Sequence, residues 1–235
     1  MICMHTKVFN SSDEEIKSKK FNVFVGISVG VKPLDENMAK EYISWALQNS
    51  KEDIIILIAD EIAKYNYIVF SSYNENKSLK RAYRDGDEHK EIFESAISKF
   101  FKDESKRIKI IHWKDILSEE YNQAKEVIEI FYEQNKDFQN KINYFLRKYT
   151  ERRNKELSEE KLKILSKYII SELPTLLSGI NFENKHYDLL LYPTYVHSGL
   201  SELSTNIFKG IEFSELKEKL NLVKKTVLVE AYIDE

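Results

Sequence analysis

The chain has little cysteine, proline or glycine: one, three and six residues among 235. A single cysteine, Cys3, excludes an intramolecular disulfide and a cysteine-based zinc site, and it fits a reducing, cytoplasmic environment. So few prolines and glycines argue against long linkers. We therefore expect a flexible N-terminal segment at residues 1–20 and a single domain at residues 21–235.

Long hydrophobic runs and a strong net charge are also lacking. No window approaches the ~20 apolar residues that a membrane span needs, and the first residues lack the basic-then-apolar order of a secretory signal. The formal net charge of -3 gives no overall attraction to nucleic acid, although a local basic face can still bind it. The composition is that of a soluble globular protein.

Apolar runs that read as strands alternate with segments of helical periodicity. The strands are expected at residues 21–28, 53–59, 107–113, 187–192 and 226–233, and the longer helices at 35–49, 74–102, 118–149 and 158–177. The second helix carries a possible break at 85–87, and Pro174 is expected to kink or end the fourth. The alternation predicts an α/β fold with a mostly parallel sheet flanked by helices.

Ligands of such sheets bind beyond the carboxyl ends of the strands. Ser28 ends the first strand, Asp60 follows the second, and Tyr192 ends the fourth. We therefore expect these three side chains to meet in one crevice. Tyr195 follows closely, and a phenol can donate, accept and shuttle a proton. Alternatively, the two tyrosines simply fill the edge of the sheet.

Residues 26–30 read G-I-S-V-G and match the G-x-S-x-G turn that presents a nucleophilic serine in α/β-hydrolases. In that fold the serine follows several strands, whereas Ser28 follows the first. A hydrolase also needs an acid and a histidine downstream, and no spacing ties His197 to Ser28. In the plain structural interpretation, the glycines permit a tight turn and Ser28 caps a helix. Both interpretations remain open.

Tyr168 and Glu172 stand one helical turn apart. Glu172 falls on the flank of an apolar stripe made by Leu162, Leu165, Ile169, Leu173 and Leu176. A carboxylate at a buried edge is costly unless it is hydrogen-bonded or binds a cation, such as a substrate ammonium. The alternative is a surface glutamate paired with Lys167 or Lys161.

A basic face is expected on the helix at 74–102, where four cations recur at i, i+3, i+4 and i+7: Lys77, Lys80, Arg81 and Arg84. Such a stripe suits a phosphate backbone, although it can equally be a solvated surface. It carries no acid before Asp85, so we expect no neutralising i,i+4 pairs. A second basic cluster comprises Arg147, Lys148, Arg152, Arg153 and Lys155.

Taken together, five motifs resemble those of the tRNA-dependent cyclodipeptide synthases. They occur in the family's order: V-G-I-S-V-G at 25–30, I-L-I-A-D at 56–60, K-S-L-K-R-A-Y-R at 77–84, Y-x-x-x-E-L-P at 168–174, and Tyr-Pro at 192–193. The family resembles the Rossmann-like catalytic domain of class I tyrosyl- and tryptophanyl-tRNA synthetases, without their ATP chemistry. Its members make a cyclic dipeptide, a diketopiperazine, from two aminoacyl-tRNAs. That substrate is already an activated ester, so the resemblance implies neither cofactor, metal nor ATP.

The resemblance also implies roles for individual residues. Ser28 would be the nucleophile of a ping-pong mechanism, carrying first an aminoacyl and then a dipeptidyl group. Tyr168 and Glu172 would hold the ammonium group, Tyr192 would assist proton transfer, and the basic face would lie under the first tRNA. The expected substrate-binding residues are Phe24, Gly26, Val31, Ile56, Thr175 and Leu190.

Two positions depart from many members of the family, which have asparagine three residues after the serine and Tyr-His at the strand end. Here these positions hold Val31 and Pro193, as in the other main subfamily. Roles tied to that asparagine or histidine are therefore not carried over. A serine hydrolase of a small ester and a non-catalytic RNA-binding Rossmann-like module remain the alternatives. The sequence gives neither the two amino acids joined nor the oligomeric state.

Overall fold

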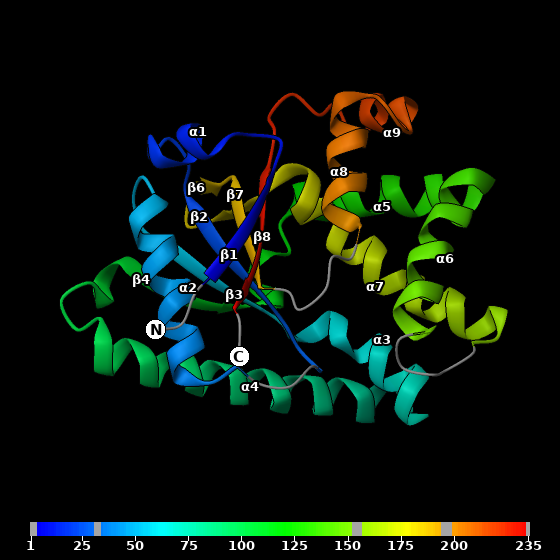
Figure 1. The fold of residues 1–235 in the computed structure, drawn as a ribbon. Coiled ribbons are helices and arrows are strands. Elements are labelled where there is room, and N and C mark those ends of the chain that lie inside the picture. The colour runs from blue at the N-terminus through cyan, green and yellow to red at the C-terminus, as the bar shows by residue number, and fades with distance from the viewer. Residues whose placement is uncertain (1–3, 31–33, 152–156, 194–198, 234–235) are drawn as a thin grey trace.

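The computed structural model describes residues 4–30, 34–151, 157–193 and 199–233. Its described part contains a six-stranded sheet in the order β1-β8-β7-β2-β3-β4 (Figure 1). The strands are β1 (Met4–Phe9), β2 (Val23–Ser28), β3 (Ile54–Ala59), β4 (Ile108–His112), β7 (Leu189–Pro193) and β8 (Val227–Ile233). All neighbouring pairs are parallel except β1 with β8. The five strands expected from the sequence are confirmed as β2, β3, β4, β7 and β8.

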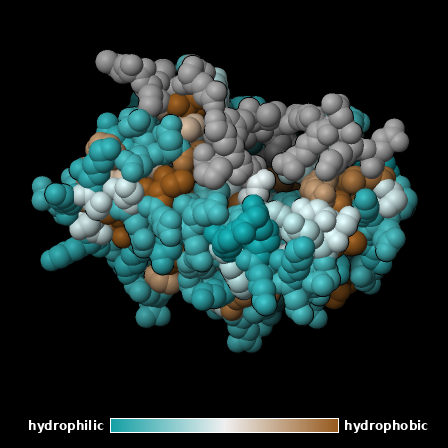
Figure 2. Space-filling view, turned by 90° about the horizontal axis from the view of Figure 1, so that it is seen from below, coloured by the Kyte–Doolittle hydropathy of each residue, from teal (hydrophilic) through white to brown (hydrophobic). Residues whose placement is uncertain are grey.

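Helices cover both faces of the sheet, which explains why its strands are apolar on both sides. One face packs against α2 (Glu36–Asn49) and α4 (Glu75–Phe100), and we call this the α4 layer. The other, the α7 layer, holds α5 (Glu119–Gln134), α6 (Lys136–Glu151), α7 (Glu159–Ser178), α8 (Leu200–Lys209) and α9 (Ser214–Lys219). Helix α3 (Asp60–Ser71) contacts both α4 and α7. The outer surface seen from the α4 side is largely hydrophilic (Figure 2).

Alternation along β2 sorts its side chains between these layers. Val23, Val25 and Ile27 belong to the core of the α4 layer. Phe24 belongs to the core of the α7 layer, so Gly26 and Ser28 face that layer as well.

The long helical segments differ from expectation at three points. Residues 118–149 form two helices, because Asn135 has an extended backbone and its side chain accepts a hydrogen bond from the Phe138 amide at 2.9 Å. The possible break at 85–87 is absent, since α4 runs straight through Gly86. Pro174 lies within α7 and does not end it. Helices α3 and α8 were not anticipated. Within the described residues, no helix is both long and apolar enough to span a membrane.

Residues 4–20 contain a strand and a short helix, where the sequence analysis expects a flexible segment. Strand β1 pairs along its whole length with β8, from Met4 opposite Ile233 to Phe9 opposite Leu228. The short helix α1 (Asp13–Lys17) follows and buries Ile16. The described part of this segment is therefore an edge strand and a packed helix rather than a loosely packed tail. None of its strand residues is fully buried, which hid the strand from the sequence pattern.

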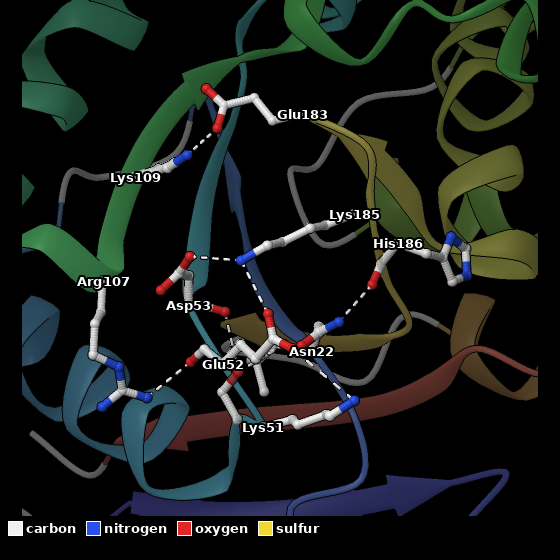
Figure 3. Close-up of polar contacts among 11 residues, drawn as sticks. Asn22, Lys51, Glu52, Asp53, Arg107, Lys109, Glu183, Lys185 and His186 are labelled. Carbon is white, nitrogen blue, oxygen red and sulfur yellow. Dashed lines mark hydrogen bonds and ion pairs between the residues drawn. The ribbon is translucent and has the colours of Figure 1, made fainter.

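A hairpin of β5 (Ile180–Phe182) and β6 (Lys185–Tyr187) covers the amino-terminal edge of the sheet, where the parallel strands begin (Figure 3). Lys185 forms ion pairs with Asp53 at 2.9 Å and Glu52 at 3.0 Å. The Asn22 side chain donates to the His186 carbonyl at 2.9 Å, and Lys109 pairs with Glu183. These contacts occupy the amino-terminal edge, so the opposite, carboxyl edge is the one left for ligands.

Candidate active site

The chain order of the sheet reverses between β2 and β7. From β2 the chain proceeds through β3 to β4 on one side, whereas β7 and β8 lie on the other. Such a switch point is where open α/β sheets bind ligands, beyond the carboxyl ends of the strands. Ser28 ends β2, and Tyr192 lies near the end of β7. The Ser28 Oγ and Tyr192 Oη atoms are 3.1 Å apart, so the expected meeting of these two residues is confirmed.

Gly26 permits this approach. A Cβ atom at position 26 would lie only 3.0 Å from Leu190 Cδ1 and 3.7 Å from Tyr192 Cδ2. A larger side chain would therefore push the β7 side chains away from β2. The first glycine of the G-I-S-V-G motif, Gly26, therefore allows the side chains of β7 to approach β2 closely.

Glu172 is buried in the α7 layer, with 5% of its surface exposed, so the alternative of a surface glutamate is wrong. Its Oε2 atom is buried and has no hydrogen-bond partner within the part of the chain that the structure describes. Desolvation raises the pKa of Glu172 to about 7, and the nearby Tyr192 hydroxyl offsets part of this rise. A buried carboxylate oxygen without a donor is suited to a substrate cation.

The two site tyrosines are neutral phenols. Burial, then the charge of Glu172, raises the pKa of both Tyr168 and Tyr192 above the usual range. Interaction with the Ser28 hydroxyl lowers both pKa values and offsets part of the rise. Ser28 therefore lies beside the neutral Tyr192 phenol, and the charge of Glu172 acts on both tyrosines.

Glu230 was missed by the sequence reasoning. It pairs in register with Tyr192 across β7 and β8, is 4% exposed, and its charge contributes to the raised pKa of Tyr192. The available signal was a single acid in the apolar strand V-L-V-E-A-Y-I. Leu228, two residues earlier, faces the α7 layer, so Glu230 does too.

The expected substrate-binding residues divide between the layers. Phe24 and Leu190 pair in register across β2 and β7, and both are buried in the α7 layer. Thr175 is buried one turn after Glu172 and donates to its carbonyl at 2.8 Å. Ile56 is in the core of the α4 layer, so it cannot line a pocket shared with Phe24 and Leu190. Val31 lies outside the described residues, as do Tyr195 and His197.

Asp60 does not join this group. Its side chain bonds to His112 Nδ1 at 2.7 Å and accepts from the Trp113 amide at 3.2 Å. It also packs beside Gly86 of α4. Asp60 therefore faces the α4 layer, whereas Ser28 faces the α7 layer. The expectation of one crevice for all three strand-end residues is wrong for Asp60.

A family model describing cyclodipeptide synthases matches residues 4–207, most of the chain. The chain belongs to the cyclodipeptide synthase family. This membership makes it a tRNA-dependent enzyme. No curated protein matches the chain in sequence.

Solved structures share the fold of this cyclodipeptide synthase. The synthase from Staphylococcus haemolyticus is 21% identical, with 98% of this chain and 100% of that chain covered and a TM-score of 0.68. The Mycobacterium tuberculosis cyclodipeptide synthetase, described as related to type I tRNA synthetases, is 12% identical, with 98% and 92% covered and a TM-score of 0.71. Tryptophanyl-tRNA synthetase from Plasmodium falciparum is 13% identical, with 91% and 52% covered and a TM-score of 0.53. The expected Rossmann-like α/β fold is confirmed.

The basic face of the synthase lies on α4, where Lys77, Lys80, Arg81 and Arg84 are all exposed. The expectation that it lacks neutralising pairs is wrong. Arg81 pairs with Asp85 at 2.8 Å and Arg84 with the same carboxylate at 3.3 Å. Of the second cluster, Arg147 pairs with Glu159 and Lys148 lies over the Tyr144 ring, while Arg152, Arg153 and Lys155 are outside the described residues.

Proposed function

We propose that this cyclodipeptide synthase forms a diketopiperazine from two aminoacyl-tRNAs by a ping-pong mechanism on Ser28. The observation that carries the proposal is the pairing of the Ser28 hydroxyl with Tyr192 at the switch point, beside the unpartnered Glu172 oxygen. A nucleophile and a cation-binding carboxylate thus stand together where an α-amino ester would need them.

In the first step, Ser28 Oγ attacks the ester carbonyl of an aminoacyl-tRNA. The bond from that carbonyl to the tRNA ribose oxygen breaks, and the serine proton ends on the ribose oxygen. One ester replaces another, so the step is near-neutral in free energy and needs positioning more than strong activation. The neutral Tyr192 phenol beside Ser28 can relay the proton.

Glu172 and Tyr168 are the proposed holders of the substrate ammonium. An ammonium ion at Glu172 Oε2 supplies the missing hydrogen-bond donor and offsets the cost of burying the charge. With a pKa raised to about 7, Glu172 can also accept the proton that the amine must lose before it attacks.

The second half of the reaction joins and releases the product. The amine of the aminoacyl-enzyme attacks the ester of the second aminoacyl-tRNA, which gives a dipeptidyl-enzyme and free tRNA. The new terminal amine then attacks the Ser28 ester, which closes the ring and returns the proton to Ser28 Oγ. Tyr192 is the proposed proton donor at this serine oxygen.

Phe24, Gly26, Thr175 and Leu190 are the proposed walls of the first side-chain pocket, and Lys77, Lys80, Arg81 and Arg84 the contacts to the first tRNA. Tyr192-Pro193 places the chain in the Tyr-Pro subfamily under this proposal. The aminoacyl-tRNA ester is already activated, so the proposed reaction uses no ATP. We expect the reaction in the cytoplasm, where aminoacyl-tRNA is made.

The first experiment is expression in bacteria followed by mass spectrometry of the medium for cyclic dipeptides. Ser28→Ala is expected to abolish both the product and the covalent aminoacyl-enzyme detected with radiolabelled aminoacyl-tRNA. Ser166→Ala, a buried serine of α7 that bonds within its own helix, is the matched control and should keep activity. Full activity of Ser28→Ala would refute the proposal.

Further assays separate the two alternatives. A serine hydrolase would turn over nitrophenyl esters without tRNA and be blocked by a fluorophosphonate. A non-catalytic module would bind RNA equally well after Ser28→Ala and give no product. The hydrogen bond described for Ser28 goes to a phenol rather than to an imidazole, which favours acyl transfer between esters.

A further inference from the structure

The carboxylate of Asp85 joins the basic face of α4 to helix α3. Its Oδ2 atom accepts from Arg81 Nε at 2.8 Å, and its Oδ1 atom accepts from Arg84 at 3.3 Å. Oδ2 also accepts from the hydroxyl of Tyr67 on α3. Asp85 is 9% exposed, whereas the Arg81 and Arg84 side chains are 42% and 57% exposed. One buried acid thus fixes two arginines that still reach solvent.

Tyr67 continues this link to the turn after the nucleophile. Gly30 has φ +88°, and a Cβ atom there would lie 3.3 Å from Tyr67 Oη and 3.7 Å from Tyr67 Cζ. The phenol therefore lies directly against the backbone of Gly30, which is two residues after Ser28. A positive φ and this close approach both favour glycine at position 30.

The link is well suited to hold a fixed geometry. Burial and the Asp85 carboxylate raise the pKa of Tyr67, so the phenol stays protonated and remains a donor. The Arg81 guanidinium also lies over the Tyr67 ring, with Cζ 6.0 Å from the ring centroid. Charge-assisted hydrogen bonds of this kind are stronger than neutral ones and more specific in direction.

We propose that Tyr67 and Asp85 are positioning residues for aminoacyl transfer: they hold the tRNA-contacting Arg81 and Arg84 in fixed register with the Gly30 turn and hence with Ser28. The inference rests on the proposed function, because it takes the α4 arginines as tRNA contacts and Ser28 as the acyl acceptor. Phosphate contacts at α4 then place the ester carbonyl relative to Ser28 Oγ. Small errors in such placement are costly to the rate.

This role makes a prediction that simple charge does not. Removing the negative charge of Asp85 leaves the basic face more positive, so electrostatics alone predicts tighter tRNA binding and no loss of rate. A positioning role predicts that binding is kept or tightened while the rate of acyl transfer falls. The positioning role therefore predicts a lower transfer rate without weaker tRNA binding.

The test uses Asp85→Asn and Tyr67→Phe in the full chain, with aminoacyl-tRNA carrying the radiolabelled amino acid found in the product. Single-turnover formation of the aminoacyl-enzyme at saturating tRNA is expected to fall about tenfold or more for Asp85→Asn and about fivefold for Tyr67→Phe. The dissociation constant for tRNA should rise no more than about twofold in either variant. The double variant should be no slower than about the slower single one, because both act through one link.

Two controls match these changes. Tyr65→Phe removes a half-buried phenol from the same helix, and Glu88→Gln removes an exposed acid 3.9 Å from Arg84. Both should transfer at the parent rate. Thermal unfolding within a few degrees of the parent would show that the slow variants are folded.

Unchanged transfer rates in both test variants, with an active parent, would overturn the positioning role alone. So would a rate loss that merely follows weaker tRNA binding or lower stability. A parent that forms neither aminoacyl-enzyme nor cyclic dipeptide would overturn the proposed function, and this inference with it. The two failures are therefore distinguishable.

Discussion

At the scale of single residues, burial changes the charge state of Glu172 near neutral pH. A carboxylate in the α7 layer is disfavoured as an ion, and its pKa rises to about 7. The folded protein therefore binds a proton on Glu172 more readily than the unfolded chain does. The stability contributed by this residue is present below about pH 4.5 and is lost as the pH rises through about 7.

Glu172→Gln is expected to flatten this pH dependence. Between pH 5 and pH 8 the free energy of unfolding of the parent should fall on the order of 3 kcal/mol more than that of the variant, because one pKa unit corresponds to about 1.4 kcal/mol. Urea unfolding at several pH values gives the comparison, and the difference in slope matters rather than the absolute stability. An equal pH dependence in the two proteins would show that Glu172 is not buried as described.

Tyr192→Phe is expected to slow cyclisation more than acylation. The phenol at 3.1 Å from Ser28 Oγ is the proposed proton donor when the serine ester is released. Loss of a general acid typically costs about a hundredfold or more in rate. The dipeptidyl-enzyme should therefore accumulate in the variant while the yield of cyclic dipeptide falls. Mass spectrometry of the intact protein and of the product measures both. Equal loss of both would contradict a role of Tyr192 that is specific to cyclisation.

At the scale of elements, the contact of α4 with the sheet depends on a glycine inside a helix. A Cβ atom at Gly86 would lie 2.8 Å from Asp60 Cβ and 3.3 Å from Ile58 Cγ2. Glycine inside a helix costs about 1 kcal/mol relative to alanine. Close packing of α4 on β3 is therefore retained at the expense of helix propensity.

Gly86→Ala is expected to lower the free energy of unfolding, because overpacking of 1–3 kcal/mol outweighs the gain of about 1 kcal/mol in helix propensity. The net loss should be about 1 kcal/mol, measured by chemical denaturation. Ser98→Ala, at an exposed position of the same helix, should not lower stability. A more stable Gly86→Ala protein would contradict the close approach of α4 to Asp60.

At the scale of the whole molecule, a protein with a net charge of -3 is proposed to bind tRNA through one helix face. Overall charge therefore opposes binding weakly while the α4 stripe favours it locally. The outer surface on the α4 side is broadly hydrophilic, in keeping with a solvated binding face (Figure 2). Binding by such a local stripe should be strongly salt-dependent.

Lys77→Gln with Lys80→Gln is expected to weaken tRNA binding about tenfold at low salt. It should also reduce the magnitude of the slope of log affinity against log salt concentration by roughly one to two. Fewer phosphate contacts mean that fewer counterions are released when the tRNA binds. Lys80 is exposed and Lys77 lies 3.8 Å over the Tyr73 ring, so neither belongs to the Asp85 link. An unchanged salt slope would remove these lysines from the tRNA contacts.

The sequence predicts the α/β class, the serine at the end of one buried strand and the tyrosine at the end of another. These features are local, because strand periodicity and strand ends can be read from neighbouring residues. The family resemblance supplied the proposed partnership of Tyr168 and Glu172 with Ser28. The structure pairs Ser28 with Tyr192, and the charge of Glu172 raises the pKa of Tyr192.

The layer that each side chain faces, and the group with which it pairs, depend on tertiary packing. Ile56 and Asp60 face the α4 layer, and Glu230 lies beside Tyr192. Asp85 neutralises part of the basic face. These outcomes depend on residues far apart in the chain that meet across strands and between helices. Burial, which sets the charge state of Glu172, is likewise a property of the packed molecule and not of its helix alone.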